Sequence, residues 1–564
     1  MTILASDWIA FHADRTPDKL AMIDQASARR FTYAEMDDRA ARLAAFFRDA
    51  WGVQRGDRLA ILAKNSTEYF EFQYACIKLG ALMLPLNWRL AEQELQFILR
   101  DSGAVGLVYD AEFAERVPPL MNAPLVHGLQ IETLTPTPLP HGEGLKKTPL
   151  PPLPLKEKGL GGKLPPLSLR EKGLGVEGEY KQETPIPNTS YTDAIDSTSV
   201  RVEMSPHTTH DDPMMIMYTA GTTGRPKGVL ITHGMMLWNA VNITTPTGLS
   251  HDSLFYCVLP TFHIGGLNLY ANPLLHLGGT NIIARQFDAG LTLQTLSDPS
   301  LPVTHMFGVP SIYLFLSQHP DFDSTDLSSV HSWGCGGAPM PVSVLEQYAQ
   351  RGIIIQLGFG MTETSPTVFL IDQHRALAKP TSVGKPLQHT RVRVVRDDFS
   401  DVTPGEVGEV VISGPNVTPG YWQRPDANAE SFTTDEHGQR WLHSGDAGTV
   451  DDDGCIYIVD RYKDMYISGG ENVYPAEVEQ VLYQIDGVAE AAVIGVPDAK
   501  WGECGMAILV LKPGCAIEAA AVIAHCQANL AKFKVPRHVA FIDVLPRNAA
   551  GKVLKRELRE QFIK

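Results

Sequence analysis

The sequence contains no apolar run long enough to cross a membrane. None of its 564 residues falls in a hydrophobic stretch of the roughly 18–20 residues that a membrane-spanning helix needs. The amino terminus, MTILASDWIAFHADRTPDK, also lacks the basic and apolar segments of a secretory signal. We therefore expect an unprocessed, soluble, cytoplasmic chain with no transmembrane segment and at most peripheral contact with a membrane.

Positive charge is scarce. The chain has 48 Lys and Arg residues against 64 Asp and Glu residues, which gives a formal net charge of −16. Sequence-independent nucleic-acid binding needs a basic surface, and so does electrostatic binding to anionic lipids. The composition therefore argues against both kinds of partner. It leaves a homodimer open.

Cysteines are few and scattered, with no C-x-x-C pair. The seven are Cys76, Cys257, Cys335, Cys455, Cys504, Cys515 and Cys526. A disulfide framework or a structural zinc site would require clustered cysteines. We expect reduced side chains that pack in a core.

Aromatic residues are absent from residues 135–179, a segment rich in Pro, Gly and Lys that repeats itself at 151–162 and 165–176. Such a segment cannot bury enough apolar area to offset the entropy of ordering it. It is either a proline-rich docking arm or a neutral insertion in a surface loop. We favour the insertion, because long surface loops cost little free energy.

The rest of the chain alternates helical and strand patterns. Residues 33–51 repeat apolar side chains at three- and four-residue steps, as an amphipathic helix does, and residues 58–63 form a short apolar strand candidate. Strands separated by helices indicate α/β layering. Near residue 460 the sequence pattern changes to that of an α+β module of about a hundred residues. We predict a large domain at 1–460, a hinge at 461–464 and a small domain at 465–564.

A glycine-rich loop, YTAGTTGRPKG, occupies residues 218–228. Glycines let backbone N–H groups approach an anion, the threonine hydroxyls donate, and Lys227 adds positive charge, so the loop suits an oligophosphate. Its spacing differs from that of a Walker A loop. The alternative interpretation is a tight turn.

Seven further stretches follow in order. They are LPTFHIGG (259–266), GCGGAPM (334–340), QLGFGMTETSP (356–366), GEVGEVVISGPNVTPGYW (405–422), WLHSGDAG (441–448), DRYKDMYISGGENVYPAEVE (460–479) and PRNAAGKVLKREL (546–558). Together they resemble the adenylate-forming superfamily of AMP-producing acyl-CoA synthetases, luciferases and nonribosomal-peptide adenylation domains. The resemblance runs from about residue 8 to the carboxyl terminus and is interrupted only by the insertion.

The resemblance implies an α/β, multidomain α+β fold. Two α/β subdomains and a β-rich subdomain would form the large region, and a small mobile α+β domain would follow. It also implies an acid–thiol ligase that uses ATP, Mg²⁺ and coenzyme A. Such an enzyme converts a carboxylic acid to an acyl-adenylate and then to acyl-CoA, with release of AMP and pyrophosphate.

The surroundings of LPTFHIGG and GCGGAPM look most like bacterial fatty-acyl-CoA synthetases, so a medium- or long-chain fatty acid is the expected substrate. The alternatives are an aryl-CoA ligase and an enzyme that loads a carrier protein. A more remote alternative is a nucleotide-binding pseudoenzyme with a partner-docking arm.

Three catalytic residues are implied by the resemblance. Lys552 matches the lysine that bridges the carboxylate and the α-phosphate, and Glu363 matches the magnesium-associated glutamate. His263 matches an acyl-site gate and argues for an acid without an α-amino group, because amino-acid-activating relatives place an aspartate nearby. Outside the motifs, these residues would be interpreted as a solvated lysine, a surface carboxylate and a core histidine.

Further residues are implied to bind the co-substrates. The ATP-binding set is Thr219, Gly221, Thr222, Thr223, Gly224, Lys227, Gly336, Gly337, Ala338, Pro339, Gly358, Phe359, Gly360, Met361, Thr362, Asp446 and Arg461. Asp446 would accept both ribose hydroxyls, since one carboxylate has two acceptor oxygens. The CoA-binding set is Gly469, Gly470, Glu471 and Asn472, and the hinge set is Lys463 and Asp464.

The sequence departs from the family pattern at three positions. Ala220 replaces the usual serine of the glycine loop, Phe359 replaces a common tyrosine, and Asp460 replaces the usual glycine before Arg461. None of these changes removes a charge that the chemistry requires. We therefore expect an active enzyme.

Overall fold

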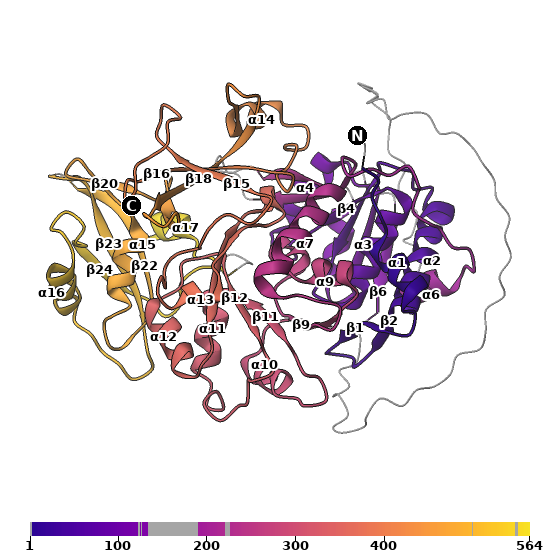
Figure 1. Ribbon diagram of the computed structural model, residues 1–564, viewed down its shortest axis with the longest axis horizontal. Helices are drawn as coiled ribbons and strands as arrows, with labels where there is room; N and C mark the ends of the chain where they lie inside the picture. Colours follow the sequence, from indigo (N-terminus) through magenta and orange to yellow (C-terminus); the bar gives the residue numbers. More distant parts are fainter. Residues whose placement is uncertain are drawn as a thin grey trace.

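The computed structural model describes residues 3–121, 125, 127–132, 190–219, 226–498, 500–547 and 551–563. These residues form four β-sheets with their helices. In Figure 1 the C-terminal sheet lies at the end of the molecule opposite α1–α3, with the other sheets between. The repetitive segment at 135–179 lies outside the described residues.

The first sheet has six strands in the order β6-β5-β3-β4-β7-β8, parallel except for the β7–β8 hairpin. The strands are β3 (Arg58–Leu62), β4 (Leu82–Pro85), β5 (Gly106–Asp110), β6 (His127–Ile131), β7 (Pro213–Thr219) and β8 (Lys227–Thr232). Its helical segments are α3 (Thr67–Leu79), α4 (Glu92–Ser102), η1 (Ala111–Arg116), α5 (Val117–Leu120) and α6 (Tyr191–Asp196).

The second sheet has eight strands in the order β14-β13-β12-β11-β9-β10-β1-β2, antiparallel only at its two edges. The strands are β1 (Leu20–Asp24), β2 (Arg30–Thr32), β9 (Leu254–Cys257), β10 (Thr280–Ile283), β11 (His305–Gly308), β12 (Ser332–Cys335), β13 (Ile355–Gly360) and β14 (Thr367–Leu370). Its helical segments are α1 (Trp8–Arg15), α2 (Tyr33–Trp51), α7 (His233–Thr247), α8 (Ile264–Asn268), α9 (Ala271–Leu277), α10 (Ala289–Leu296), α11 (Pro310–Ser317), α12 (Val342–Gln350), η2 (Thr362–Thr364) and α13 (Gln373–Ala376).

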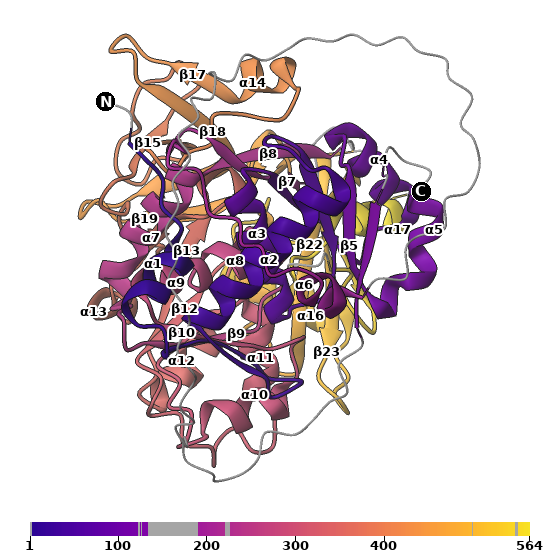
Figure 2. The same ribbon diagram turned by 90° about the vertical axis from the view of Figure 1, so that its right-hand side faces the viewer.

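Helices α2 and α3 form a layer shared by the two large sheets. Helix α3 contacts β4 of one sheet and β1 of the other, and Figure 2 shows α2 and α3 between strands of both. The predicted helix at 33–51 coincides with α2. Thr32 and Glu35 close a capping box at its start, and Gly52 ends it with a φ of 67°. One apolar core therefore joins both sheets.

Two smaller sheets complete the chain. The β-rich sheet contains β15 (Arg391–Val395), β16 (Gly408–Ser413), β17 (Phe432–Thr434), β18 (Arg440–Val450) and β19 (Ile456–Arg461), with α14 (Pro425–Ser431) beside it. The C-terminal sheet contains β20 (Tyr466–Ser468), β21 (Glu471–Val473), β22 (Val488–Asp498), β23 (Gly502–Leu511) and β24 (His538–Phe541), with α15 (Pro475–Leu482), α16 (Ala519–Asn529) and α17 (Lys555–Phe562).

This architecture confirms the predicted fold of two α/β subdomains, a β-rich subdomain and a small α+β domain. The predicted hinge at 461–464 begins at Arg461, the last residue of β19, and continues into the segment before β20. The domain limits themselves stay a prediction.

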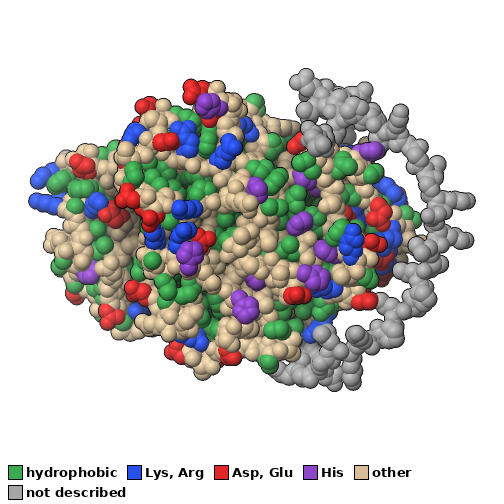
Figure 3. All heavy atoms as spheres, viewed as in Figure 1, with side chains coloured by type: hydrophobic (Ala, Val, Ile, Leu, Met, Phe, Trp, Pro, Cys, Tyr) green, Lys and Arg blue, Asp and Glu red, His purple; other side chains and the backbone are tan. Residues whose placement is uncertain are grey.

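Among the described residues, no helix combines the length and the apolar character of a membrane span. On the face drawn in Figure 3, acidic and basic side chains of the described residues are interspersed. All seven cysteines carry free thiols, of which Cys515 is exposed and the others are buried.

Asn65 joins the carboxyl ends of strands from both large sheets. It follows β3, and its Nδ2 donates to the carbonyls of Leu259 (2.9 Å) and Ala284 (3.0 Å), which follow β9 and β10. Its Oδ1 accepts from the backbone N–H (2.8 Å) and the hydroxyl (3.1 Å) of Thr261. Since every bond is buried, this one amide holds the loop that leads to His263.

We expect Asn65→Ala to destabilise the large domain strongly. The change leaves two carbonyls, one N–H and one hydroxyl buried without these partners, and each costs about 1–3 kcal/mol. Denaturant unfolding of the variant would measure the loss. Asn529→Ala is the matched control, because that exposed amide donates only to His525 O within α16. Equal midpoints for the two variants would contradict the assignment.

Candidate active site

Asp446 and Arg461 form the centre of the site. They are opposite partners in the antiparallel β18–β19 pair, and Arg461 Nε lies 3.1 Å from Asp446 Oδ1. Burial raises the pKa of Asp446, and the charges of Arg461 and Lys552 only partly offset that effect. Asp446 Oδ2 is buried and has no hydrogen-bond partner within the described structure. The pair therefore presents an acceptor that a ligand hydroxyl would satisfy.

Glu363 lies beside this pair in the short turn η2 after β13. Its Oε1 accepts a hydrogen bond from the hydroxyl of Tyr421 (3.0 Å), and its carbonyl accepts from Thr418 N–H (2.8 Å). Burial raises the pKa of Glu363, opposed by Tyr421, Arg461 and Lys227. A divalent cation would offset that burial cost, since hard cations prefer carboxylate oxygens.

Lys227 approaches the same place from the first sheet. It is paired with Thr219 at the loop end of the β7–β8 hairpin, and its Nζ lies 5.1 Å from the centre of the Tyr421 ring. The predicted phosphate-loop residues between them lie outside the described residues. They are Gly221, Thr222, Thr223 and Gly224.

Lys552 reaches the site from the C-terminal domain. Burial and the positive charge of Arg461 together lower the pKa of Lys552 to about 8, whereas Asp446 and Asp464 oppose the shift. The loop that carries it is held by Arg547, whose Nη1 donates to Gly551 O (2.6 Å). The structure thus brings Lys227, Glu363, Asp446, Arg461 and Lys552 together from three sheets and a loop.

An apolar cavity adjoins the carboxyl ends of β11, β12 and β13. It encloses about 700 Å³, counting its solvent-open mouth. Six predicted ATP-binding residues line it, namely Gly336, Gly337, Gly358, Phe359, Gly360 and Met361. The remaining wall is mostly aliphatic and aromatic, from Ile243, Leu259, Leu269, Phe307, Val309, Phe369 and Leu370. Ala338, Pro339 and Thr362 lie next to these wall residues in sequence.

Two lining residues must be glycine, because the backbone packs closely against each of them. A Cβ at Gly336 would lie 2.9 Å from Gly358 O, and a Cβ at Gly360 would lie 1.9 Å from Pro366 O. Neither position has room for a side chain. The walls at these points are therefore bare backbone.

His263 lines the cavity at the start of α8. Its Nδ1 accepts a hydrogen bond from Gly265 N–H (3.2 Å), which caps the helix. Burial lowers the pKa of His263 to about 4, so the ring is neutral at pH 7. Because Nδ1 is the acceptor, the proton resides on Nε2. His263 is thus both a helix cap and a neutral hydrogen-bond donor.

The predicted CoA-binding residues form the β20–β21 hairpin of the C-terminal sheet, away from the Asp446–Arg461 pair. Gly469 and Gly470 have φ values of 64° and 90°. A Cβ at Gly469 would collide with the Trp501 ring at 2.2 Å, whereas Gly470 faces open space. Glu471 and Asn472 follow as exposed residues of β21.

Sequence reasoning missed Tyr421 as a site residue. It stands in the quoted motif GEVGEVVISGPNVTPGYW, which was its only signal. Its ring and hydroxyl lie between Lys227 and Glu363, so it links the two charges that flank the site.

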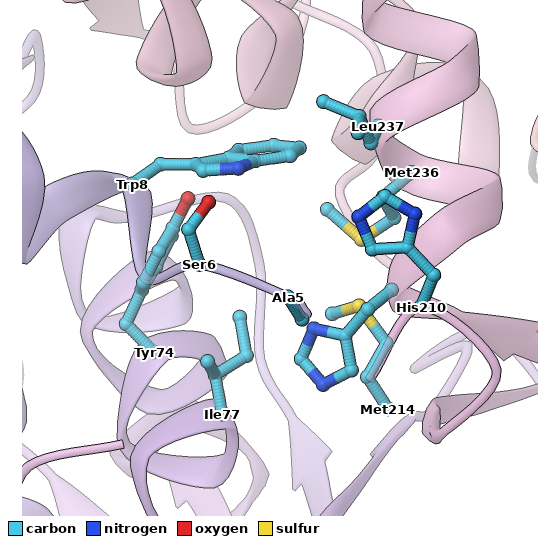
Figure 4. A pocket seen from close by; sticks show the side chains of 10 residues that line it. Ala5, Ser6, Trp8, Tyr74, Ile77, His210, Met214, Met236 and Leu237 are labelled. Atoms are coloured by element: carbon cyan, nitrogen blue, oxygen red, sulfur yellow. The ribbon is translucent and has the colours of Figure 1, made fainter. Parts of the chain in front are cut away.

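A second, smaller cavity lies between the amino-terminal segment, α3 and α7 (Figure 4). The hydroxyls of Ser6 and Tyr74 point toward the Trp8 indole in this view, with His210 across the cavity. None of the predicted site residues lines it. We assign it to imperfect packing of the core.

Lys552 should titrate near pH 8 in the ligand-free protein. Burial disfavours its ammonium form, so half-maximal reactivity toward an amine reagent should fall at about pH 8 rather than at the ordinary lysine value of about 10.4. Competitive acetylation read by mass spectrometry measures this, and Lys552→Arg identifies the signal. Asp446→Asn should lower the value further, because Asp446 stabilises the ammonium. An ordinary titration would show that Lys552 lies in solvent.

Known proteins match the chain over nearly its whole length. The AMP-binding enzyme family matches residues 9–422, and the AMP-binding enzyme C-terminal domain matches residues 477–552. A feruloyl-CoA synthase of Amycolatopsis sp is 39% identical, covering 98% of this chain and 98% of that protein. The long-chain-fatty-acid–CoA ligase FadD13 of Mycobacterium tuberculosis is 33% identical, covering 97% and 96%.

A solved structure agrees with these matches. The o-succinylbenzoate coenzyme A synthetase of Bacillus subtilis, in complex with ATP and a magnesium ion, superposes with a TM-score of 0.78 at 29% identity, covering 98% of this chain and 99% of that chain. The resemblance to the adenylate-forming superfamily is thereby confirmed.

Proposed function

The chain belongs to the AMP-binding enzyme family and is an acid–thiol ligase, and from this premise we propose that it activates an aryl carboxylic acid of the hydroxycinnamate type. ATP, Mg²⁺ and CoA are the other reactants and cofactors of such a ligase. This substrate class replaces the fatty acid expected from the sequence. The pseudoenzyme alternative is set aside, because the family is one of ligases.

The apolar cavity carries the proposal. Of its lining residues, His263 is the sole titratable one, so the body of the acid is uncharged and without an ammonium group. Phe307, Phe359 and Phe369 contribute aromatic rings to the wall, which suit a planar ring. The 39% identity to a feruloyl-CoA synthase supports an aryl acid more than the 33% identity to a fatty-acid ligase supports a fatty acid.

His263 would orient the acid without adding charge. Its neutral ring offers Nε2–H as a donor, which suits a carboxyl, hydroxyl or methoxy oxygen. Protonation of the ring begins only as the pH approaches about 4, so this role persists across the neutral range.

The nucleotide would occupy the charged centre. The orphaned Asp446 Oδ2 accepts from the ribose, with Arg461 beside it, and Lys227 pairs with phosphate oxygens. Glu363 is the residue suited to hold Mg²⁺, which when bound neutralises phosphate charge. Burial disfavours the charged forms of Asp446 and Glu363, so hydrogen bonds from the ribose and contact with a cation would stabilise both carboxylates.

Lys552 would serve the first half of the reaction. Attack of the carboxylate on the α-phosphate of ATP forms the acyl-adenylate and releases pyrophosphate, and this step depends on positioning and charge. Below about pH 8 Lys552 is an ammonium close to Asp446 and Arg461, suited to bridge the two anionic reactants. In the second half, CoA thiolate attacks the acyl carbonyl and AMP leaves. The open backbone at Gly470 suits the approach of pantetheine.

A panel of acids tests the substrate class. The purified protein, with ATP, Mg²⁺ and CoA, should release pyrophosphate with ferulate, coumarate and other aryl acids at a kcat/KM at least about tenfold above that with decanoate or palmitate, a difference of about 1.4 kcal/mol. A preference for the fatty acids would overturn the aryl assignment. Turnover that requires a phosphopantetheine carrier instead of CoA would overturn the acceptor.

Asp446→Ala should weaken use of ATP and spare CoA. The lost hydrogen bonds are buried and charge-assisted, so kcat/KM for ATP should fall by an amount equivalent to about 2–4 kcal/mol, with the KM for CoA unchanged. Steady-state kinetics with ferulate measures both constants. Asp453→Ala is the control, since that exposed carboxylate follows β18 and pairs with Lys379. Equal effects of the two changes would show that Asp446 has no part in binding ATP.

A further inference from the structure

Helix α17 carries two basic residues on one face, opposite two acidic residues, Asp460 in β19 and Asp464 in the segment that connects β19 to β20. Lys555 Nζ lies 4.0 Å from Asp460 Oδ2, and Arg559 Nη1 lies 3.3 Å from Asp464 Oδ1. The spacing is four residues on both sides, so successive turns of the helix meet these two acidic residues in order. Arg559 Nη2 also donates to Asp464 O (3.4 Å).

The pair at Lys555 is part of a buried cluster. Its Nζ lies 2.8 Å from Glu479 Oε1 on α15, an oxygen that also accepts from Val493 N–H (2.8 Å). The side chains of Lys555, Glu479 and Asp460 are only 13%, 14% and 10% exposed. Charges this deeply placed hold their partners firmly, because separation leaves one of them unpaired in the interior.

Asp460 connects this cluster to the catalytic centre. Its Oδ2 accepts from Ala476 N–H at the start of α15 (2.9 Å), and its Oδ1 accepts from the N–H of Arg461 (2.7 Å). Arg461 is in turn the partner of Asp446. The glycine that the family pattern has at this position could make none of these side-chain contacts.

Lys552 stands three residues before Lys555. Its loop is closed by Arg547, which binds Gly551 O and pairs by a β-bridge with Val553. With the loop closed at one end, the placement of α17 sets where Lys552 lies. We propose that Lys555 and Arg559, acting through Asp460 and Asp464, position Lys552 beside the Asp446–Arg461 pair for adenylate formation.

These four are positioning residues and touch no reactant. The proposal rests on the proposed function, in which Lys552 bridges carboxylate and α-phosphate. In this proposal the ion pairs of α17 have two effects. They raise the rate of adenylate formation, and, separately, they stabilise the C-terminal domain. The proposal also gives a use to Asp460, the departure from the family pattern.

The variants are Asp460→Asn and Lys555→Met, with Arg556→Gln as the matched control. Arg556 lies on the same helix, is exposed, and pairs only with Glu560 at 3.6 Å in the described structure. Pyrophosphate release from ATP and ferulate should fall about 10- to 100-fold in kcat in both variants, since a displacement of about 1 Å can cost this much. The KM for ATP and the conversion of supplied feruloyl-adenylate plus CoA should stay within about threefold.

The pKa of Lys552 separates positioning from simple electrostatics. Removing a negative charge from the surroundings of a lysine cannot by itself raise its pKa, whereas release of Lys552 into water raises its pKa from about 8 toward the ordinary value. We expect the rise in Asp460→Asn, measured by the competitive acetylation described above. The double variant should lose little more than either single one, because both break the same contact. Lys555→Arg should restore most of the rate.

The outcomes are distinct. If no aryl acid drives pyrophosphate release in the unmodified enzyme, the proposed function fails. If the unmodified enzyme is active and Asp460→Asn matches Arg556→Gln in rate and in Lys552 titration, the positioning role fails. Should Lys555→Met not fold, Arg559→Gln decides by the same criteria, because Arg559 pairs with Asp464 rather than with Asp460 or Glu479 in the described structure.

Discussion

The pairing register of β18 and β19 is the constraint on which the rest of the site depends. It sets Asp446 directly opposite Arg461 and so pairs a buried carboxylate with a half-buried guanidinium at the end of the β-rich sheet. A slip of one strand by one residue would place the two side chains on opposite faces of the sheet. The other charged groups of the site lie around this pair. Glu363 and Lys227 approach from the large sheets, and Lys552 approaches from the C-terminal domain.

Parallel-strand architecture supplies the remaining geometry. The carboxyl ends of β3, β9 and β10 meet at Asn65, and those of β11, β12 and β13 border the apolar cavity. Ligand sites of open α/β sheets form at such ends, where loops diverge and backbone groups are free. The apolar cavity and the charged centre are neighbours because the two large sheets and the β-rich sheet end at the same place. The chemistry needs that adjacency, since the acid must reach the α-phosphate.

Much of this could be predicted from the sequence. The 3.6-residue pattern at 33–51 specified α2, and the ordered motifs specified the fold and the residues that converge, Glu363, Asp446, Arg461 and Lys552 among them. The contacts that hold these residues could not be predicted. Tyr421 reaches Glu363 across 58 positions and Asn65 reaches Ala284 across 219, separations at which no local pattern exists. The substrate class is subject to the same limit, because the cavity walls come from several segments that are distant in the sequence.

The ligand-free site is electrostatically costly. Asp446 and Glu363 sit where burial raises the pKa of both carboxylates, and Asp446 Oδ2 has no donor within the described residues. A nucleotide and its cation would remove that cost only in the folded chain, so by mass action they shift the folding equilibrium toward the native state. The population of unfolded enzyme that proteases can attack would then fall as ATP rises. In a cell, the abundance of this ligase would be coupled to the energy charge, with no regulatory domain required.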